Sequence, residues 1–164
     1  MPTGRPSRYP PSVSTSTPPG ADIRLVVGYD GSAPATRALD AAIRLLQGRT
    51  GRIDVVYVGH MPSLAALSPD AVAEIEMGFD DIATELRTAA GEQLRGHEAS
   101  WGFERRQGLI ADELMAAAKD LGAAHPGDTV VIVVGSSSLA THRVVGSVAV
   151  NLARHSLVPL IVVP

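Results

Sequence analysis

The chain has 164 residues, 45% of them apolar, and a formal net charge of −3. That is enough for one domain with a hydrophobic core, and the acidic balance argues against a general nucleic-acid-binding protein. No apolar stretch approaches the roughly 18 residues of a membrane span. We expect no secretory signal, because no apolar block follows the N-terminal Arg residues. The absence of cysteine excludes disulfides and thiol chemistry. By elimination, we expect a cytoplasmic location.

The first segment differs in composition from the rest of the chain. Its first twenty residues hold six of the twelve prolines, several Ser and Thr, and almost no large apolar side chains. Such a composition cannot bury enough surface to offset the entropy of ordering. Residues 1–21 are therefore predicted to be a disordered leader, with a partner-binding arm as the alternative, and residues 22–164 to form the folded domain.

From residue 22 onward, strand patterns alternate with helix patterns. Apolar, β-branched runs predict strands at residues 23–29, 53–58, 129–134 and 158–163, and a weaker alternation predicts one around residues 101–105. Helical periodicity and capping residues predict helices at residues 32–47, from 68 to about 96, at 110–121 with Gly122 as the stop, and from Gly146 or Ser147 to His155.

Two of these helices begin with residues typical of a helix N-terminus, and one of them shows a clear apolar face. Ser32 is a suitable N-cap with Pro34 in the first turn, and Ser68 precedes Pro69 in the same way. In the long second helix the predicted buried stripe consists of Val72, Ile75, Phe79, Ile82, Leu86 and Ala89.

Strands joined by helices of this length predict an α/β fold with an open parallel sheet and helices on both faces. In such a sheet, ligands bind beyond the carboxyl ends of the strands, where the strand order reverses. The ends of two strands are therefore candidates for one site.

Both of these strand ends carry residues typical of nucleotide binding. The first strand ends in Gly28-Tyr29-Asp30, which supplies a carboxylate, and the fourth ends in Val134-Gly135 followed by three serines. The next helix opens with Gly146-Ser147, whose free N–H groups favour an anion such as phosphate. The alternative is local: Asp-Gly-Ser is common turn and capping chemistry, and Gly135 then only ends a strand.

Other chemistries fit less well. No Gly-x-Gly-x-x-Gly follows the first strand, and no Gly-Lys-Ser or Gly-Lys-Thr follows a glycine-rich turn. Ser137 lies in a strand-to-helix turn, but Leu139 occupies the position of the second glycine of a hydrolase elbow. The five histidines show no metal-ligand spacing with a carboxylate. Neither a P-loop NTPase nor a metalloenzyme is indicated.

The segment Val27-Gly28-Tyr29-Asp30-Gly31-Ser32, with Ala38 and Ala42, resembles the opening strand and helix of the universal stress protein family. The strand, Gly-Ser turn, Gly-Ser helix start and final apolar strand of residues 131–163 are similar to that family's C-terminal half. The resemblance implies a five-stranded parallel sheet in the order 3-2-1-4-5 with four helices (Rossmann-like).

Nucleotide-binding members of that family carry Gly, two residues, Gly, nine residues, then Gly and Ser or Thr. This chain matches at Gly135 and at Gly146-Ser147, but Ser138 replaces the second Gly, and seven residues, 139–145, precede Gly146. By resemblance, Asp30 contacts the adenosine. His142 and Arg143 lie in the same loop and are candidates to supply positive charge, with a solvated loop as the alternative. The other implied nucleotide-binding residues are Gly28, Tyr29, Tyr57, Val58, Val134, Gly135, Ser137, Ser138, Gly146, Ser147 and Val148.

The resulting function is a stress-related regulatory protein that binds an adenine nucleotide. ATP is the first choice, AMP or cyclic AMP the alternatives, and Mg²⁺ is left open. No residue is assigned a catalytic role, so binding with slow or no hydrolysis is expected. The expected partners are a second copy, paired through the last strand, and an unidentified regulatory protein, but neither nucleic acid nor membrane. The alternative function is a nucleotide-free protein–protein adaptor, also dimeric, with a degenerate cleft.

Overall fold

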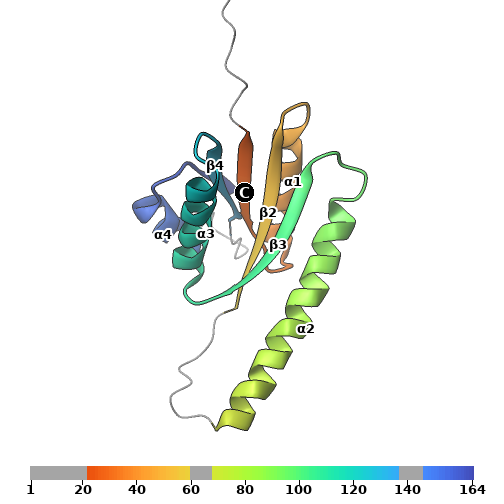
Figure 1. The fold of residues 1–164 in the computed structure, drawn as a ribbon, viewed down its shortest axis with the longest axis vertical. Helices are drawn as coiled ribbons and strands as arrows, with labels where there is room; N and C mark the ends of the chain where they lie inside the picture. The colour runs from red at the N-terminus through yellow and green to blue at the C-terminus, as the bar shows by residue number, and fades with distance from the viewer. Residues whose placement is uncertain (1–21, 60–67, 137–145) are drawn as a thin grey trace, which may run out of the picture.

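The computed structural model describes residues 22–59, 68–136 and 146–164 (Figure 1). Five parallel strands form one sheet in the order β3-β2-β1-β4-β5. The strands are β1 (Ile23–Gly28), β2 (Gly51–Gly59), β3 (Ser100–Gln107), β4 (Thr129–Gly135) and β5 (Leu160–Val163). The helices are α1 (Ala33–Leu46), α2 (Pro69–Gln93), α3 (Ile110–Ala124) and α4 (Ser147–His155). The predicted fold class and strand order are confirmed.

The helices cover both faces of the sheet. On one face, α1 and the C-terminal end of α2 pack on side chains such as Leu25, Val27 and Ile53. On the other face, α3 and α4 pack on side chains such as Val26 and Ile132. Because successive residues of a strand point to opposite faces, the continuous apolar runs of β1 and β4 serve both cores.

The buried stripe of α2 differs from the predicted one. Ile82 is 44% exposed and Ala89 is exposed, whereas Ala83 and Ala90 are buried. At 3.6 residues per turn, positions 82 and 83 both fit a stripe through Phe79 and Leu86, so spacing alone does not separate them. In the structure, the buried positions of α2 are Ala83 and Ala90.

Two predicted boundaries, the end of the third helix and the start of the last strand, were wrong. Helix α3 continues through Gly122 and ends at Ala124. Its C-cap, His125, precedes Pro126, and a residue before proline is disfavoured in the helical conformation. Strand β5 begins at Leu160 rather than at Val158, because the loop before it is held in a different conformation by hydrogen bonds between Ser156 Oγ and the backbone of Val158.

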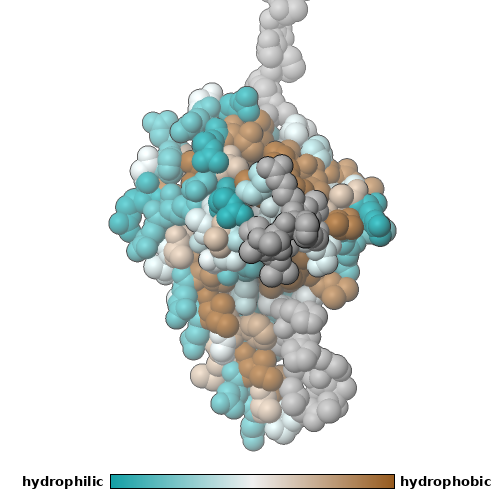
Figure 2. Space-filling view, turned by 180° about the vertical axis from the view of Figure 1, so that it is seen from behind, coloured by the Kyte–Doolittle hydropathy of each residue, from teal (hydrophilic) through white to brown (hydrophobic). Residues whose placement is uncertain are grey.

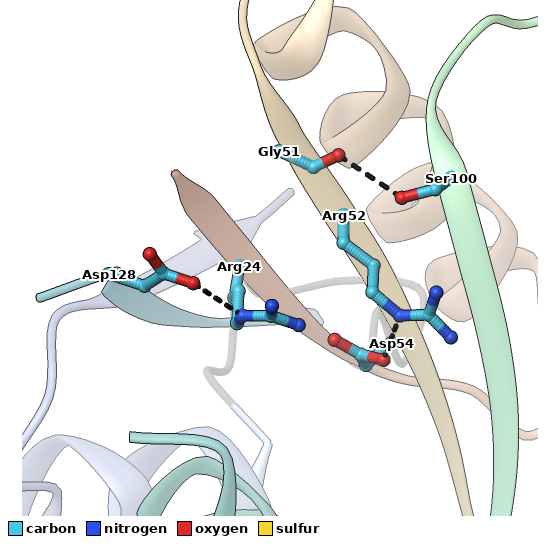
Figure 3. A network of polar contacts seen from close by, with 6 residues as sticks. All are labelled: Arg24, Gly51, Arg52, Asp54, Ser100 and Asp128. Carbon is cyan, nitrogen blue, oxygen red and sulfur yellow. Dashed lines mark hydrogen bonds and ion pairs between the residues drawn. The ribbon is translucent and has the colours of Figure 1, made fainter. Parts of the chain in front are cut away.

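Charged side chains gather at the end of the sheet where the strands begin (Figure 3). Arg24 Nε donates to Asp128 Oδ2 at 2.7 Å, which ties β1 to the residue before β4, and Arg52 Nε donates to Asp54 Oδ1 at 2.9 Å within β2. These pairs lie at the opposite end of the strands from the carboxyl ends. No functional residue was predicted at this end of the sheet.

None of the helices in the described ranges is both long and apolar enough to cross a bilayer. The predicted leader, residues 1–21, lies outside the described residues.

Candidate functional site

A cavity of about 240 Å³ opens at the carboxyl ends of β1 and β4. These strands are neighbours in the sheet, although the chain visits β2 and β3 between them. The strand order therefore reverses between them, and this is where parallel sheets place their ligands. The cavity is lined by Gly28, Tyr29, Asp30, Ser32, Pro34, Ala35, Val56, Val58, Ile110, Leu114, Val134, Gly135, Gly146, Ser147, Val148 and Ala149.

Asp30 stabilises a turn and also lines the cavity. Its Oδ1 accepts a hydrogen bond from the Ser32 backbone N–H at 3.0 Å, and Gly31 between them has a φ of +76°. Ser32 Oγ in turn accepts from the N–H of Ala35 at 3.3 Å and caps α1. The local interpretation of Asp-Gly-Ser is thus confirmed, yet the Asp30 carboxylate is exposed and lines the cavity.

Gly135 is required by packing as well as by its place at the end of β4. A Cβ at this position would overlap the backbone carbonyl of Pro34 in the first turn of α1. The next residue, Ser136, donates its N–H to the carbonyl of Val163 at 2.7 Å. The absence of a side chain at Gly135 therefore lets the start of α1 approach the end of β4 and close one wall of the cavity.

The N-terminus of α4 faces the cavity without a side-chain cap. Its N-cap is Gly146, and the first intrahelical acceptor, the Gly146 carbonyl, receives the N–H of Val150 at 3.0 Å. The N–H groups of Ser147, Val148 and Ala149 precede that bond and have no acceptor among the described residues. Together with the helix dipole, they form the kind of site that binds an anion.

The remaining wall is apolar and was missed by the sequence analysis. Val56 belongs to β2, Ile110 and Leu114 to the first turns of α3, and all three line the cavity. Pro34, Ala35 and Ala149 were also missed, whereas Ser32 belongs to the Asp30-Gly31-Ser32 segment indicated by the sequence. No local signal marks the α3 residues. An apolar residue in a helix is predicted to belong to the hydrophobic core unless the element packed against it is known.

Tyr57 is the one predicted site residue in the described ranges that does not line the cavity. Val56 and Val58, its neighbours in β2, do. Because alternate residues of a strand point to opposite faces, Tyr57 has its side chain on the other side of the sheet, where it is 9% exposed. The predicted residues Ser137 and Ser138, together with His142 and Arg143, lie outside the described residues.

The electrostatics of the described lining are simple. Asp30 is its one residue with a formal charge at neutral pH, and neither Lys nor Arg is among the lining residues that the structure describes. Within the same ranges, no group of three or more His, Asp or Glu residues is arranged to hold a metal ion. Among the described residues, the groups suited to an anion are the first backbone N–H groups of α4 and the Ser147 hydroxyl.

Comparisons with protein families and solved structures show which proteins this chain is similar to. The family model of the universal stress protein family matches residues 24–164. No curated protein matches significantly. Among solved structures, the universal stress protein UspA from Lactobacillus plantarum is 20% identical with a TM-score of 0.69, the alignment covering 88% of this chain and 99% of that one.

Two further solved structures carry nucleotides. A universal stress protein in complex with cAMP is 24% identical, with a TM-score of 0.61 and coverage of 88% of this chain and 99% of that one. A universal stress protein family protein from Arabidopsis thaliana with AMP bound is 13% identical, with a TM-score of 0.55 and coverage of 86% and 90%. At these identities the likeness concerns the fold. The family match over residues 24–164 shows that the chain belongs to the universal stress protein family.

Proposed function

We propose that this protein is a regulatory protein that binds an adenine nucleotide in the cavity between the ends of β1 and β4. The observation that carries the proposal is a single cavity that joins an uncapped helix N-terminus, an exposed carboxylate and an apolar wall. These three features match the three parts of a nucleotide: phosphate, ribose and base. The cAMP and AMP complexes of two proteins with this fold give the proposal further support.

We assign the orientation of the nucleotide from the chemistry of these three features of the cavity. The base lies against the apolar side chains of Val56, Val58 and Leu114, which remove its faces from water. Asp30 accepts hydrogen bonds from the ribose hydroxyls through the carboxylate oxygen that Ser32 does not use. The phosphate accepts hydrogen bonds from the first N–H groups of α4 and from the Ser147 hydroxyl.

The choice among adenine nucleotides is guided by the solved structures with this fold. One holds cAMP and another holds AMP, each with one phosphate. Although ATP is the first choice from the sequence, we therefore propose a nucleotide with one phosphate, AMP or cyclic AMP, as the tighter ligand.

Calorimetric titration of ATP, ADP, AMP and cyclic AMP into wild type and Ser147→Glu tests this proposal. Ser147 is exposed at the first position of α4, where an acidic side chain interacts favourably with the helix dipole. The variant should therefore keep or gain thermal stability while it repels the phosphate, and we expect the affinity to fall at least about tenfold.

The matched control is Val150→Glu, which adds the same charge one turn further along α4, on an exposed residue outside the cavity lining. It should bind the nucleotide nearly as wild type does. If wild type binds none of the four nucleotides, the proposal fails, and the adaptor function from the sequence analysis takes its place. Equal losses in both variants would place the phosphate elsewhere.

We further propose that the protein is a homodimer that pairs through β5. The two edges of the sheet differ in charge: β3 carries Glu104, Arg105 and Arg106, whereas β5 consists of Leu160–Val163 without a charge. Charged edge strands resist pairing with another chain, and an uncharged apolar edge favours it. This contrast supports β5 as the pairing edge.

A further inference from the structure

The first half of α2 is less buried than the second half. The helix has 25 residues, and its N-terminal end extends past the ends of the strands (Figure 1). The C-terminal half is anchored, because Ala90 is buried and the Gln93 side-chain amide donates to the Thr36 carbonyl at 2.8 Å. Between residues 69 and 82, in contrast, not one residue is buried.

This half of the helix exposes apolar side chains. Met77 is 68% exposed and Ile82 is 44% exposed, and hydrophobic residues reach the surface along this part of the molecule (Figure 2). Gly78, next to Met77, has open space where a Cβ would stand, so a second chain can approach the helix backbone closely there. Met is an adaptable side chain that is over-used at binding surfaces.

The same half is strongly acidic. Six acidic residues and no basic ones lie between residues 69 and 86: Asp70, Glu74, Glu76, Asp80, Asp81 and Glu85. They include the like-charge i,i+4 pairs 70/74, 76/80 and 81/85, which destabilise a helix that stands alone. Among the described residues, Asp80 alone of the six has an ionic partner, Arg105 of β3.

Charge decides between the two kinds of protein that could cover this surface. A second copy, packed helix against helix, would bring the acidic residues of the two α2 helices together, and the repulsion would oppose pairing. A segment with Lys or Arg beside apolar residues would neutralise the acidic residues and also cover Met77 and Ile82. The exposed apolar residues and the charge thus lead to the same kind of partner.

We propose that the exposed face of α2 formed by Glu74, Met77, Asp81, Ile82 and Glu85 is a docking surface for a basic, amphipathic helix of another protein. The five positions lie within one side of the helix at 100° per residue. Residues 69–86 span about 27 Å at 1.5 Å per residue, enough to contact four to five turns of a partner helix. The surface does not include any residue of the nucleotide cavity.

The test uses the full chain and two synthetic 18-residue peptides as probes. One peptide has Leu at i, i+3, i+4 and i+7 spacing and Lys elsewhere, and the second has Glu in place of every Lys. Fluorescence anisotropy measures binding to labelled peptide. We expect saturable binding of the Lys peptide and none of the Glu peptide. Absence of saturable Lys-peptide binding, or equal binding of both peptides, overturns the proposal.

Protein variants then locate the contact. Glu74→Lys with Asp81→Lys should weaken Lys-peptide binding about tenfold. The control, Glu92→Lys with Glu98→Lys, changes the net charge equally at exposed positions away from the surface and should have little effect. Met77→Ser with Ile82→Ser should also weaken binding while leaving the melting temperature nearly unchanged. An equal loss in the charge control, or no loss in the serine variant, overturns the proposal.

Discussion

At the scale of single residues, the site depends on side chains and backbone groups that serve the fold and the cavity together. Asp30 accepts from the Ser32 N–H and still presents its carboxylate to the cavity. Gly135 lacks the Cβ that would overlap Pro34, and this close approach shapes the cavity wall. A substitution at such a residue changes both stability and binding. Variants therefore have to be chosen so that the two effects can be measured separately.

Asp30→Asn and Asp30→Ala separate the two roles of Asp30. Asparagine keeps a side-chain oxygen for the Ser32 N–H, so the unfolding free energy should stay within about 0.5 kcal/mol of wild type. Both variants lose the charged acceptor, and we expect about tenfold weaker nucleotide binding or more. Urea denaturation and calorimetry measure the two quantities. Wild-type affinity in Asp30→Asn would show that Asp30 is a turn residue only.

At the scale of elements, α2 illustrates how a helix selects its buried face. Of the predicted stripe, Val72, Ile75, Phe79 and Leu86 are half-buried and Ile82 and Ala89 are exposed, whereas the buried positions are Ala83 and Ala90. Ala90 is fully buried beside the α1 core, whereas Ala89 is exposed. Two successive residues of a helix lie about 100° apart around its axis. A periodic pattern of small residues does not show which of the two is buried.

Leucine substitutions at these two neighbours test the observed face. Ala90→Leu adds three carbons to a filled space and should cost about 1–3 kcal/mol of unfolding free energy. Ala89→Leu places the same carbons in solvent and should change the free energy by less than about 0.5 kcal/mol. Chemical denaturation measures both. A larger loss at position 89 than at 90 would favour the stripe predicted from spacing.

At the scale of the whole molecule, the proposed dimer depends on the outer backbone groups of β5. The carbonyls of Pro159 and Val163 accept from the N–H groups of Ile132 and Ser136. Because backbone groups alternate in direction along a strand, the N–H of Val162 points away from β4, toward the free edge. This group is available to a second chain without any change in the monomer.

Val162→Pro removes that N–H and should convert the proposed dimer to a folded monomer, because proline is tolerated in an edge strand where its nitrogen faces solvent. Val162→Thr is the control: it keeps the N–H and a similar shape and should remain dimeric. Sedimentation velocity at micromolar concentration measures the assembly. A wild type that sediments as a monomer refutes the dimer, and a dimeric Val162→Pro would move it to another surface.

The sequence by itself determined the alternation of strands and helices, the fold class and the positions of the strand ends. These features depend on local chemistry: β-branched runs, the Ser32 cap, and helical spacing. It also indicated Asp30, Gly135 and Gly146, because turn and helix-start residues carry their signal in the sequence itself. The resemblance to a family supplied the strand order, which local patterns leave open.

The tertiary structure alone decided which side chains complete the cavity and which faces remain open. Ile110 and Leu114 line it only because α3 packs beside β1, more than 80 residues away in the chain, and the pleat of β2 turns the Tyr57 side chain away from it. The choice of Ala83 and Ala90 for the buried face of α2 depends on how the helix packs against the rest of the domain. Such features arise from contacts between distant segments, for which a local pattern carries no signal.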